Sequence, residues 1–146
     1  MKIKWLHLLL VLLQFGGIFY FLISGAIFPV NWYIAIFLVD AILLGLWAIV
    51  SMNSKTISVL PDARVEATLT KKGPYKLLRH PMYTAVLELL IALLLNDFSW
   101  LRLIVLLIVV GVLVTKISIE EKILNQKYLE YSEYMKSTKK LIPFVY

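Results

Sequence analysis

The chain has 146 residues, of which 61% are apolar and 16% charged, and its formal net charge is +6. Soluble domains have about a quarter charged residues, so this composition excludes a water-soluble domain and predicts a surface that faces lipid. Cysteine is absent and only two histidines occur, which excludes disulfides and cysteine-bound metals and argues against any metal site.

The N-terminal third of the chain contains two predicted membrane spans. No charged residue occurs between Lys4 and Asp40. Such a stretch can cross a hydrocarbon core of about 30 Å twice, at roughly 20 residues per crossing. Pro29-Val30-Asn31 marks the reversal of direction. The two predicted spans are residues 5–28 and 32–50.

Two further apolar runs follow a polar stretch and are separated by Asn96, Asp97, Phe98 and Ser99. They predict a helical hairpin with spans at residues 82–95 and 100–115. The first of these runs is short for a full crossing. The sequence therefore predicts an all-α polytopic membrane protein with about four transmembrane helices, in a single membrane domain that comprises residues 1–146.

The positions of the cations predict the orientation of these spans. Lysines and arginines precede the first span, lie between the second and third, and follow the fourth, whereas Arg102 alone lies near the opposite side. The positive-inside rule then makes both termini and the long polar loop cytoplasmic. Because the cations border apolar spans, we expect anionic lipid headgroups as their partners and no nucleic acid.

The C-terminal segment, residues 116–146, contains a predicted cytoplasmic amphipathic helix that continues from the fourth span. Lys116 and Glu120 are four residues apart and share a face of this helix. In the simplest alternative they form an ordinary ion pair worth a few tenths of a kcal/mol. The residues with helical spacing are Ile117, Leu124, Tyr128, Tyr131 and Met135.

The loop before the third span contains residues with chemical potential. Gly73-Pro74 is a turn signal, and Pro81 suits the first turn of a helix. Arg79, His80 and Tyr83 then lie at a helix N-terminus, where free amides favour an anionic group such as a carboxylate. The alternative is that Arg79 anchors headgroups, His80 is an N-cap and Tyr83 is an interfacial aromatic residue.

Two carboxylates occur within the predicted spans. Asp40 and Glu88 each cost roughly 2.5 to 3.5 kcal/mol to insert, so we expect both to point inward. His80, Thr84 and Glu88 recur every fourth residue, which places Glu88 two turns deeper on the face of His80. Glu88 is a candidate to line an acceptor pocket and receive a proton, or else it is a protonated carboxyl bonded between helices. For Asp40 we expect a structural role.

The sequence from Thr68 to Pro143 resembles the isoprenylcysteine carboxyl methyltransferase family and its phospholipid methyltransferase relatives. The resemblance rests on short motifs in a characteristic order around the helical hairpin. These motifs are Gly73-Pro74-Tyr75, Arg79-His80-Pro81-Met82-Tyr83, Glu120-Glu121 with Leu124, and Tyr131, Tyr134 and Leu141-Ile142-Pro143.

The resemblance implies an S-adenosylmethionine-dependent methyltransferase whose cofactor lies in a cytoplasm-facing pocket covered by the C-terminal segment. The implied cofactor-binding loop comprises residues 67–83. Lys116 stands where relatives that methylate a prenylated carboxylate have a substrate-binding arginine, and Ala85 stands where a glycine is common. The implied cofactor contacts are Ala67, Thr68, Leu69, Thr70, Tyr75, His80, Pro81, Met82, Tyr83 and Glu120, and the catalytic candidates are Glu88 and Lys116.

These residue types suit the groups that S-adenosylmethionine presents. Glu120 can pair with its ammonium or accept from the ribose hydroxyls, and His80 can meet its carboxylate. Tyr75 and Tyr83 can stack on adenine or face the sulfonium. We therefore predict methyl transfer to a lipophilic acceptor of the carboxylate, amine or thiol class that enters from the bilayer. The alternatives are a small four-span transporter and a non-catalytic membrane scaffold.

Overall fold

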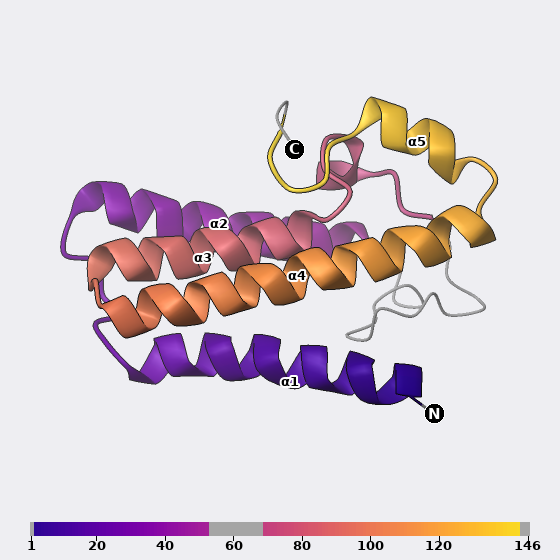
Figure 1. Cartoon of the computed structure of the whole chain (residues 1–146). Helices are drawn as coiled ribbons and strands as arrows, with labels where there is room; N and C mark the ends of the chain where they lie inside the picture. The colour runs from indigo at the N-terminus through magenta and orange to yellow at the C-terminus, as the bar shows by residue number, and fades with distance from the viewer. Residues whose placement is uncertain (1, 53–68, 144–146) are drawn as a thin grey trace.

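The computed structural model describes residues 2–52 and 69–143, which form five α-helices and one short 3-10 helix. Figure 1 shows the four long helices side by side, with the short elements gathered at one end. The all-α prediction is therefore confirmed. The elements are α1 (Lys2–Ile23), α2 (Trp32–Ser51), η1 (Gly73–Lys76), α3 (Pro81–Asn96), α4 (Trp100–Lys127) and α5 (Tyr131–Ser137).

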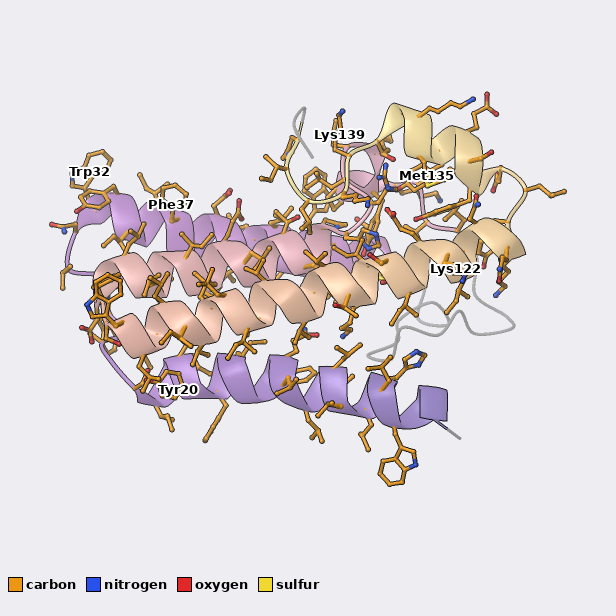
Figure 2. The ribbon with its side chains drawn as sticks, in the orientation of Figure 1. Tyr20, Trp32, Phe37, Lys122, Met135 and Lys139 are labelled. Carbon is orange, nitrogen blue, oxygen red and sulfur yellow. The ribbon has the colours of Figure 1, made fainter. Side chains whose placement is uncertain are left out.

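The long helices identify an integral membrane protein. Among the described residues, α1, α2 and α4 are long and apolar enough to cross a bilayer, and α3 is a shorter apolar helix. Their outer surfaces carry large apolar side chains: Trp32 is 76% exposed and Phe37 is 50% exposed. Both point away from the bundle in Figure 2, as expected for side chains in contact with lipid.

The core lies between α1, α3 and α4. Phe21, Leu90, Val109 and Leu113 are completely buried there. On its other side α3 packs against α2, where a Cβ added to Gly45 would lie 3.5 Å from the Cβ of Ala85. Ala85 therefore faces a glycine of the neighbouring helix, and α2 and α3 approach closely at this point.

The first helix ends at Ile23, before the predicted end of the span at Phe28. The connection that follows is held by the C-terminal end of α3. Asn96 Nδ2 donates to the carbonyls of Ala26 and Phe28 at 2.9 Å each, and the Ala26 amide donates to Asp97 at 3.0 Å. These side-chain bonds replace the intrahelical bonds that a longer α1 would have made.

Asp40 does not point inward as expected. Helix α2 buries Ile34, Ala41 and Ala48, which recur every seven residues and form one narrow stripe. Asp40 lies beside this stripe and is exposed, yet it is near enough to Glu88 of α3 for the two charges to interact. Glu88, on α3, is half-buried, and its Oε2 is enclosed without a hydrogen-bond partner among the described residues.

The predicted continuous C-terminal helix is wrong beyond Lys127. Helix α4 runs from the fourth span as far as Lys127, and Tyr128 then adopts an extended conformation. The chain turns back into α5, where Tyr131 and Tyr134 are buried. In this position the Tyr134 hydroxyl donates to the Tyr75 carbonyl at 2.6 Å, in the loop before α3. The burial of the two rings, together with this bond, stabilises the turn more than a longer α4 would.

Candidate functional site

The C-terminal segment is hydrogen-bonded along the loop that precedes α3. The Arg79 amide donates to the Lys139 carbonyl at 2.7 Å, and the Lys139 amide donates to the Leu77 carbonyl at 3.0 Å. The His80 amide donates to the Lys140 carbonyl at 3.1 Å. The segment therefore covers the loop in the manner of a short parallel strand pair and brings α5 over the N-terminus of α3.

The loop itself is fixed against the end of α2 at η1. Gly73 has a φ of +57°, which L side chains rarely adopt. A Cβ at this position would also meet Ser51 Oγ and would lie 3.0 Å from Trp47 Nε1. Both the backbone conformation and the lack of space for a side chain therefore require glycine at position 73. Tyr75, two residues later, is buried.

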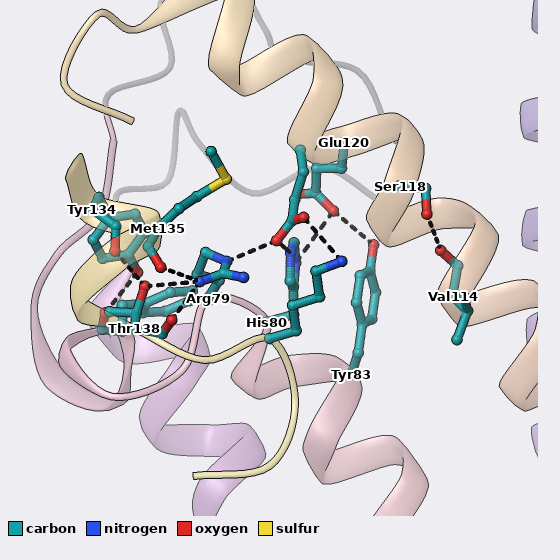
Figure 3. A network of polar contacts seen from close by, with 12 residues as sticks. Arg79, His80, Tyr83, Val114, Ser118, Glu120, Tyr134, Met135 and Thr138 are labelled. Carbon is teal, nitrogen blue, oxygen red and sulfur yellow. Dashed lines mark hydrogen bonds and ion pairs between the residues drawn. The ribbon is translucent and has the colours of Figure 1, made fainter. Parts of the chain in front are cut away.

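Arg79 is the centre of the polar network drawn in Figure 3. Its Nε donates to Glu121 Oε1 at 2.7 Å, and its Nη1 donates to the Met135 carbonyl at 3.0 Å and to the Thr138 carbonyl. The Arg79 side chain is only 8% exposed. The alternative that Arg79 anchors lipid headgroups is therefore wrong, and its guanidinium instead connects the loop, α4 and α5.

His80 lies between two adjacent glutamates of α4. Its Nε2 is 3.4 Å from Glu121 Oε1, and its Nδ1 is 3.7 Å from Glu120 Oε2. The ring stacks on Tyr83 with 5.6 Å between ring centroids and 13° between planes. His80 occupies the N-cap position of α3, but its side chain makes no capping bond. Both imidazole nitrogens therefore face glutamate oxygens, and the ring itself is only 4% exposed.

Glu120 is the more accessible of the two glutamates. Its side chain is 33% exposed, against 12% for Glu121. Tyr83 donates its hydroxyl to Glu120 Oε2 at 3.2 Å. Glu120 therefore presents a carboxylate that is oriented by Tyr83 and still open on one side, whereas Glu121 is committed to Arg79, to His80 and to Lys140 at 3.5 Å.

Lys116 lies one turn before Glu120 on α4 and is 1% exposed. Its Nζ donates to Gln14 Oε1 at 2.6 Å and lies 5.4 Å from the centre of the Tyr83 ring. Lys116 and Glu120 thus share a helix face, as predicted, and both contact Tyr83, one at the ring and one at the hydroxyl. The lysine is more than a surface i, i+4 partner.

The apolar part of α4 ends before Lys116, and the charged turns beyond it carry groups with shifted pKa values. Burial would raise the pKa of Glu121, but hydrogen bonds from His80 and Arg79 outweigh it and lower the pKa to about 2. Burial raises the pKa of Tyr134 to about 12, opposed by Arg79. Burial, then the charge of Glu120, raises the pKa of Tyr75.

Tyr131 is the other buried aromatic residue of the covering segment. It is 1% exposed, and its hydroxyl has no hydrogen-bond partner among the described residues. Burial, then the charge of Glu121, raises the pKa of Tyr131. Buried hydroxyls are nearly always hydrogen-bonded, so this one is a group whose partner is expected to come from a ligand or from water.

The residues expected from the sequence fall into three groups in the structure. Tyr75, His80, Tyr83, Glu120 and Lys116 come together where the loop meets α3 and α4. Pro81 and Met82 form the adjacent first turn of α3, Leu69 and Thr70 are half-buried, and Glu88 lies deeper on α3 outside the polar network. Ala67 and Thr68 lie outside the described residues.

Two site residues were missed as individual candidates. Glu121 was recognised only as part of a family motif, although the acid pair Glu120-Glu121 was the available signal. Gln14 was not a candidate. Between His7 and Ser24 the sequence is apolar except for Gln14 and Tyr20. A polar amide within a predicted span could have been taken as a signal, because such groups need a partner in the membrane.

Residues 31–130 match a protein-family model that is described as phospholipid methyltransferase. The match covers more than half of the chain and includes α2, η1, α3 and all of α4. Helix α1 and helix α5 lie outside it. No curated protein matches the chain.

Proposed function

The chain belongs to the phospholipid methyltransferase family, and we propose that it is an S-adenosylmethionine-dependent methyltransferase acting on a lipophilic acceptor that enters from the bilayer. The observation that carries the proposal is the convergence of His80, Tyr83 and Glu120 at the start of α3, beneath the C-terminal segment. A half-open carboxylate, an imidazole and aromatic rings are groups that can bind the ammonium, the carboxylate and the adenine of this cofactor.

The residues present fit the cofactor on two observations. The Glu120 carboxylate is oriented by one tyrosine and still 33% exposed on its side chain, which suits a cationic or hydroxyl partner. The Tyr131 hydroxyl is buried without a partner among the described residues. S-adenosylmethionine supplies an already activated methyl group, so transfer requires alignment and exclusion of water and no protein nucleophile.

We assign the binding roles residue by residue. Glu120 holds the ammonium or the ribose hydroxyls, and His80 meets the carboxylate. Tyr75 and Tyr83 offer ring faces to the adenine or to the sulfonium. Tyr131 supplies a hydroxyl from the covering segment. The remaining proposed contacts are Ala67, Thr68, Leu69, Thr70, Pro81 and Met82.

The network around Arg79 keeps the covering segment closed over this site. Arg79 joins Glu121 of α4 to the backbone of Met135 and Thr138, so the loop and the C-terminal segment are held as one unit. Such closure keeps water from the reacting groups. Arg79 and Glu121 are positioning residues in this proposal.

Glu88 and Lys116 are proposed to act on the acceptor side. Glu88 lies two turns deeper in the bundle than His80 and has an enclosed oxygen without a partner among the described residues. We assign to it the reception of a proton from the acceptor or the orientation of the acceptor. The site and both termini are proposed to be cytoplasmic, because the basic residues border that side of the spans.

The test is calorimetric titration of S-adenosylhomocysteine, the demethylated product, into detergent-purified protein. Binding in the micromolar range is expected, and the absence of heat at high micromolar ligand would contradict the enzyme proposal. A second measurement identifies the acceptor: labelled methyl groups are traced from S-adenosylmethionine into extracted lipids and into added lipophilic acids, amines and thiols. Binding without transfer to any of these would indicate a non-catalytic member of the family.

A further inference from the structure

Helix α1 lies outside the residues that match the family model, yet it packs along α4. Its buried positions recur three and four residues apart, so they form one continuous stripe. Most are apolar or small, as expected for helix packing in a membrane. Gln14 is a polar exception in the middle of the stripe and is 6% exposed. The buried residues of this stripe are His7, Leu10, Gln14, Gly17 and Phe21.

Gln14 contacts the most deeply buried lysine of the described residues. Lys116 is 1% exposed, and its Nζ donates to Gln14 Oε1 at 2.6 Å. A buried ammonium is stable only where hydrogen bonds replace its hydration, and a bond from a charged donor is stronger than a neutral one. The amide oxygen of α1 therefore contributes directly to keeping Lys116 in place.

The contact continues from Lys116 into the candidate site. The ammonium lies 5.4 Å from the centre of the Tyr83 ring, and the Tyr83 hydroxyl donates to Glu120 Oε2 at 3.2 Å. The Tyr83 ring also stacks on the ring of His80. Gln14, Lys116, Tyr83 and Glu120 thus form an uninterrupted series of contacts that runs from α1 to α4, then to α3 and back to α4.

We propose that Gln14 is a positioning residue of the methyl-transfer site: it holds the Lys116 ammonium against the Tyr83 ring, and α1 thereby becomes part of the acceptor side of the site. This inference rests on the proposed function. Without the amide oxygen, the lysine loses an acceptor and its flexible stem can turn toward Glu120, four residues along the same helix face. Tyr83 and Glu120 would then lose their present arrangement.

A purely structural role for Gln14 makes different predictions. If the bond served only to attach α1 to α4, its loss would lower stability and leave the activity of the folded protein unchanged. If Gln14 acts through Lys116, its removal changes turnover only while Lys116 is present. A double-mutant cycle separates the two cases, because coupled residues are not additive.

The experiment compares Gln14→Leu, Gln14→Glu, Lys116→Met and the double variant Gln14→Leu/Lys116→Met with the parent protein. Phe15→Leu, at the exposed neighbouring position, is the matched control on α1. Three quantities are measured in detergent: the unfolding temperature, the affinity for S-adenosylhomocysteine, and labelled-methyl incorporation into a total membrane-lipid extract. Gln14→Met, which keeps the length of the side chain, replaces Gln14→Leu if the latter does not fold.

We expect Gln14→Leu to lower the turnover number by about tenfold, equivalent to about 1.4 kcal/mol. Gln14→Glu retains most of the activity because its carboxylate can also accept from the ammonium, and Phe15→Leu behaves like the parent. The double variant is no slower than Lys116→Met alone. Affinity for S-adenosylhomocysteine falls in Gln14→Leu as well, because Tyr83 and Glu120 lose their arrangement, and it stays close to that of the parent in Gln14→Glu and Phe15→Leu.

Two results would overturn the inference while the proposed function stands. One is a folded Gln14→Leu protein that is as active as Phe15→Leu, and the other is a double variant whose losses multiply. A parent protein that neither binds S-adenosylhomocysteine nor incorporates methyl groups overturns the proposed function, and the inference with it. In that case the unfolding temperatures of the single and double variants still show whether Gln14 and Lys116 are energetically coupled.

Discussion

Arg79 and Glu121 form a nearly buried ion pair that connects the loop before α3 with the end of α4. The Nε of Arg79 lies 2.7 Å from Glu121 Oε1, and the two side chains are 8% and 12% exposed. Lys71 and Glu130 are also 2.7 Å apart, but their side chains are 39% and 61% exposed. The same distance in two environments allows the contribution of burial to be measured directly.

Glu121→Gln is expected to destabilise the protein far more than Glu130→Gln. Removing one partner of a buried pair leaves an uncompensated charge and costs about 3 to 5 kcal/mol, whereas exposed pairs contribute about 0.2 to 1 kcal/mol. Thermal unfolding of both variants in the same detergent tests the difference. Equal shifts in the unfolding temperature would show that the charge of Arg79 is compensated without Glu121.

The same pair predicts a loss of stability in acid. Interactions with His80 and Arg79 hold the pKa of Glu121 at about 2 in the folded protein, below its ordinary value of 4.5. A group with a depressed folded pKa stabilises the fold above its unfolded pKa, and this contribution is lost as the pH falls from about 4.5 toward 2. The unfolding temperature should therefore drop across this range.

Glu121→Gln is the matched comparison for this acid effect. The variant is less stable at neutral pH, but its unfolding temperature should vary less between about pH 5 and about pH 3, which bracket the ordinary glutamate pKa of 4.5. A parent and a variant with parallel pH profiles would mean that another carboxylate is responsible for the acid transition.

Glu120→Ala and His80→Ala should each weaken S-adenosylhomocysteine binding by about tenfold or more, equivalent to about 1.4 kcal/mol. Glu120 loses its charge at the open side of the site, and His80 loses the ring that stacks on Tyr83. Lys122→Ala is the control, since Lys122 is an exposed cation on the same helix and is labelled in Figure 2. Calorimetry on folded variants gives the affinities. Unchanged values would place the pocket elsewhere.

The two tyrosines of α5 should respond differently to loss of their hydroxyls. Tyr134 donates to the Tyr75 carbonyl at 2.6 Å, so Tyr134→Phe leaves a buried acceptor unpaired at a cost of about 1 to 3 kcal/mol. The Tyr131 hydroxyl has no partner among the described residues. Tyr131→Phe should therefore leave the unfolding temperature of the ligand-free protein nearly unchanged while it weakens S-adenosylhomocysteine binding. The reverse pattern would assign the structural hydroxyl to Tyr131.

The broad fold was predictable because it depends on long apolar runs. Charge-free stretches predicted α1 and α2, and the Gly73-Pro74 turn and Pro81 correctly predicted the loop and the start of α3. These features are local, and each follows from composition or from a single backbone preference. The gathering of His80, Tyr83 and Glu120 was expected from the family resemblance, since no local rule brings α3 and α4 together at that point.

The remaining details depend on packing and were not predictable. Nearly every residue of α1 and α2 is apolar, so the pattern does not reveal which face is buried. The burial of Gln14 and the exposure of Asp40 were therefore not predicted. Adjacent glutamates point about 100° apart on a helix, so only the structure assigns Glu121 to Arg79. The end of α4 at Lys127 follows from burial of the α5 tyrosines.

Glu88 provides the most direct test of the acceptor side. Its Oε2 is enclosed and unpartnered among the described residues, and it lies two turns below His80 on α3. Glu88→Gln keeps the shape and removes the proton acceptor, and a general base contributes about 10² to 10⁴ to a rate. We therefore expect turnover with the identified acceptor to fall by about 10² or more, whereas the affinity for S-adenosylhomocysteine stays unchanged. Glu133→Gln, at an exposed carboxylate of α5, is the control and should remain active. Full activity in Glu88→Gln would leave this carboxylate a structural group, because a residue that receives the proton cannot be replaced by an amide without loss.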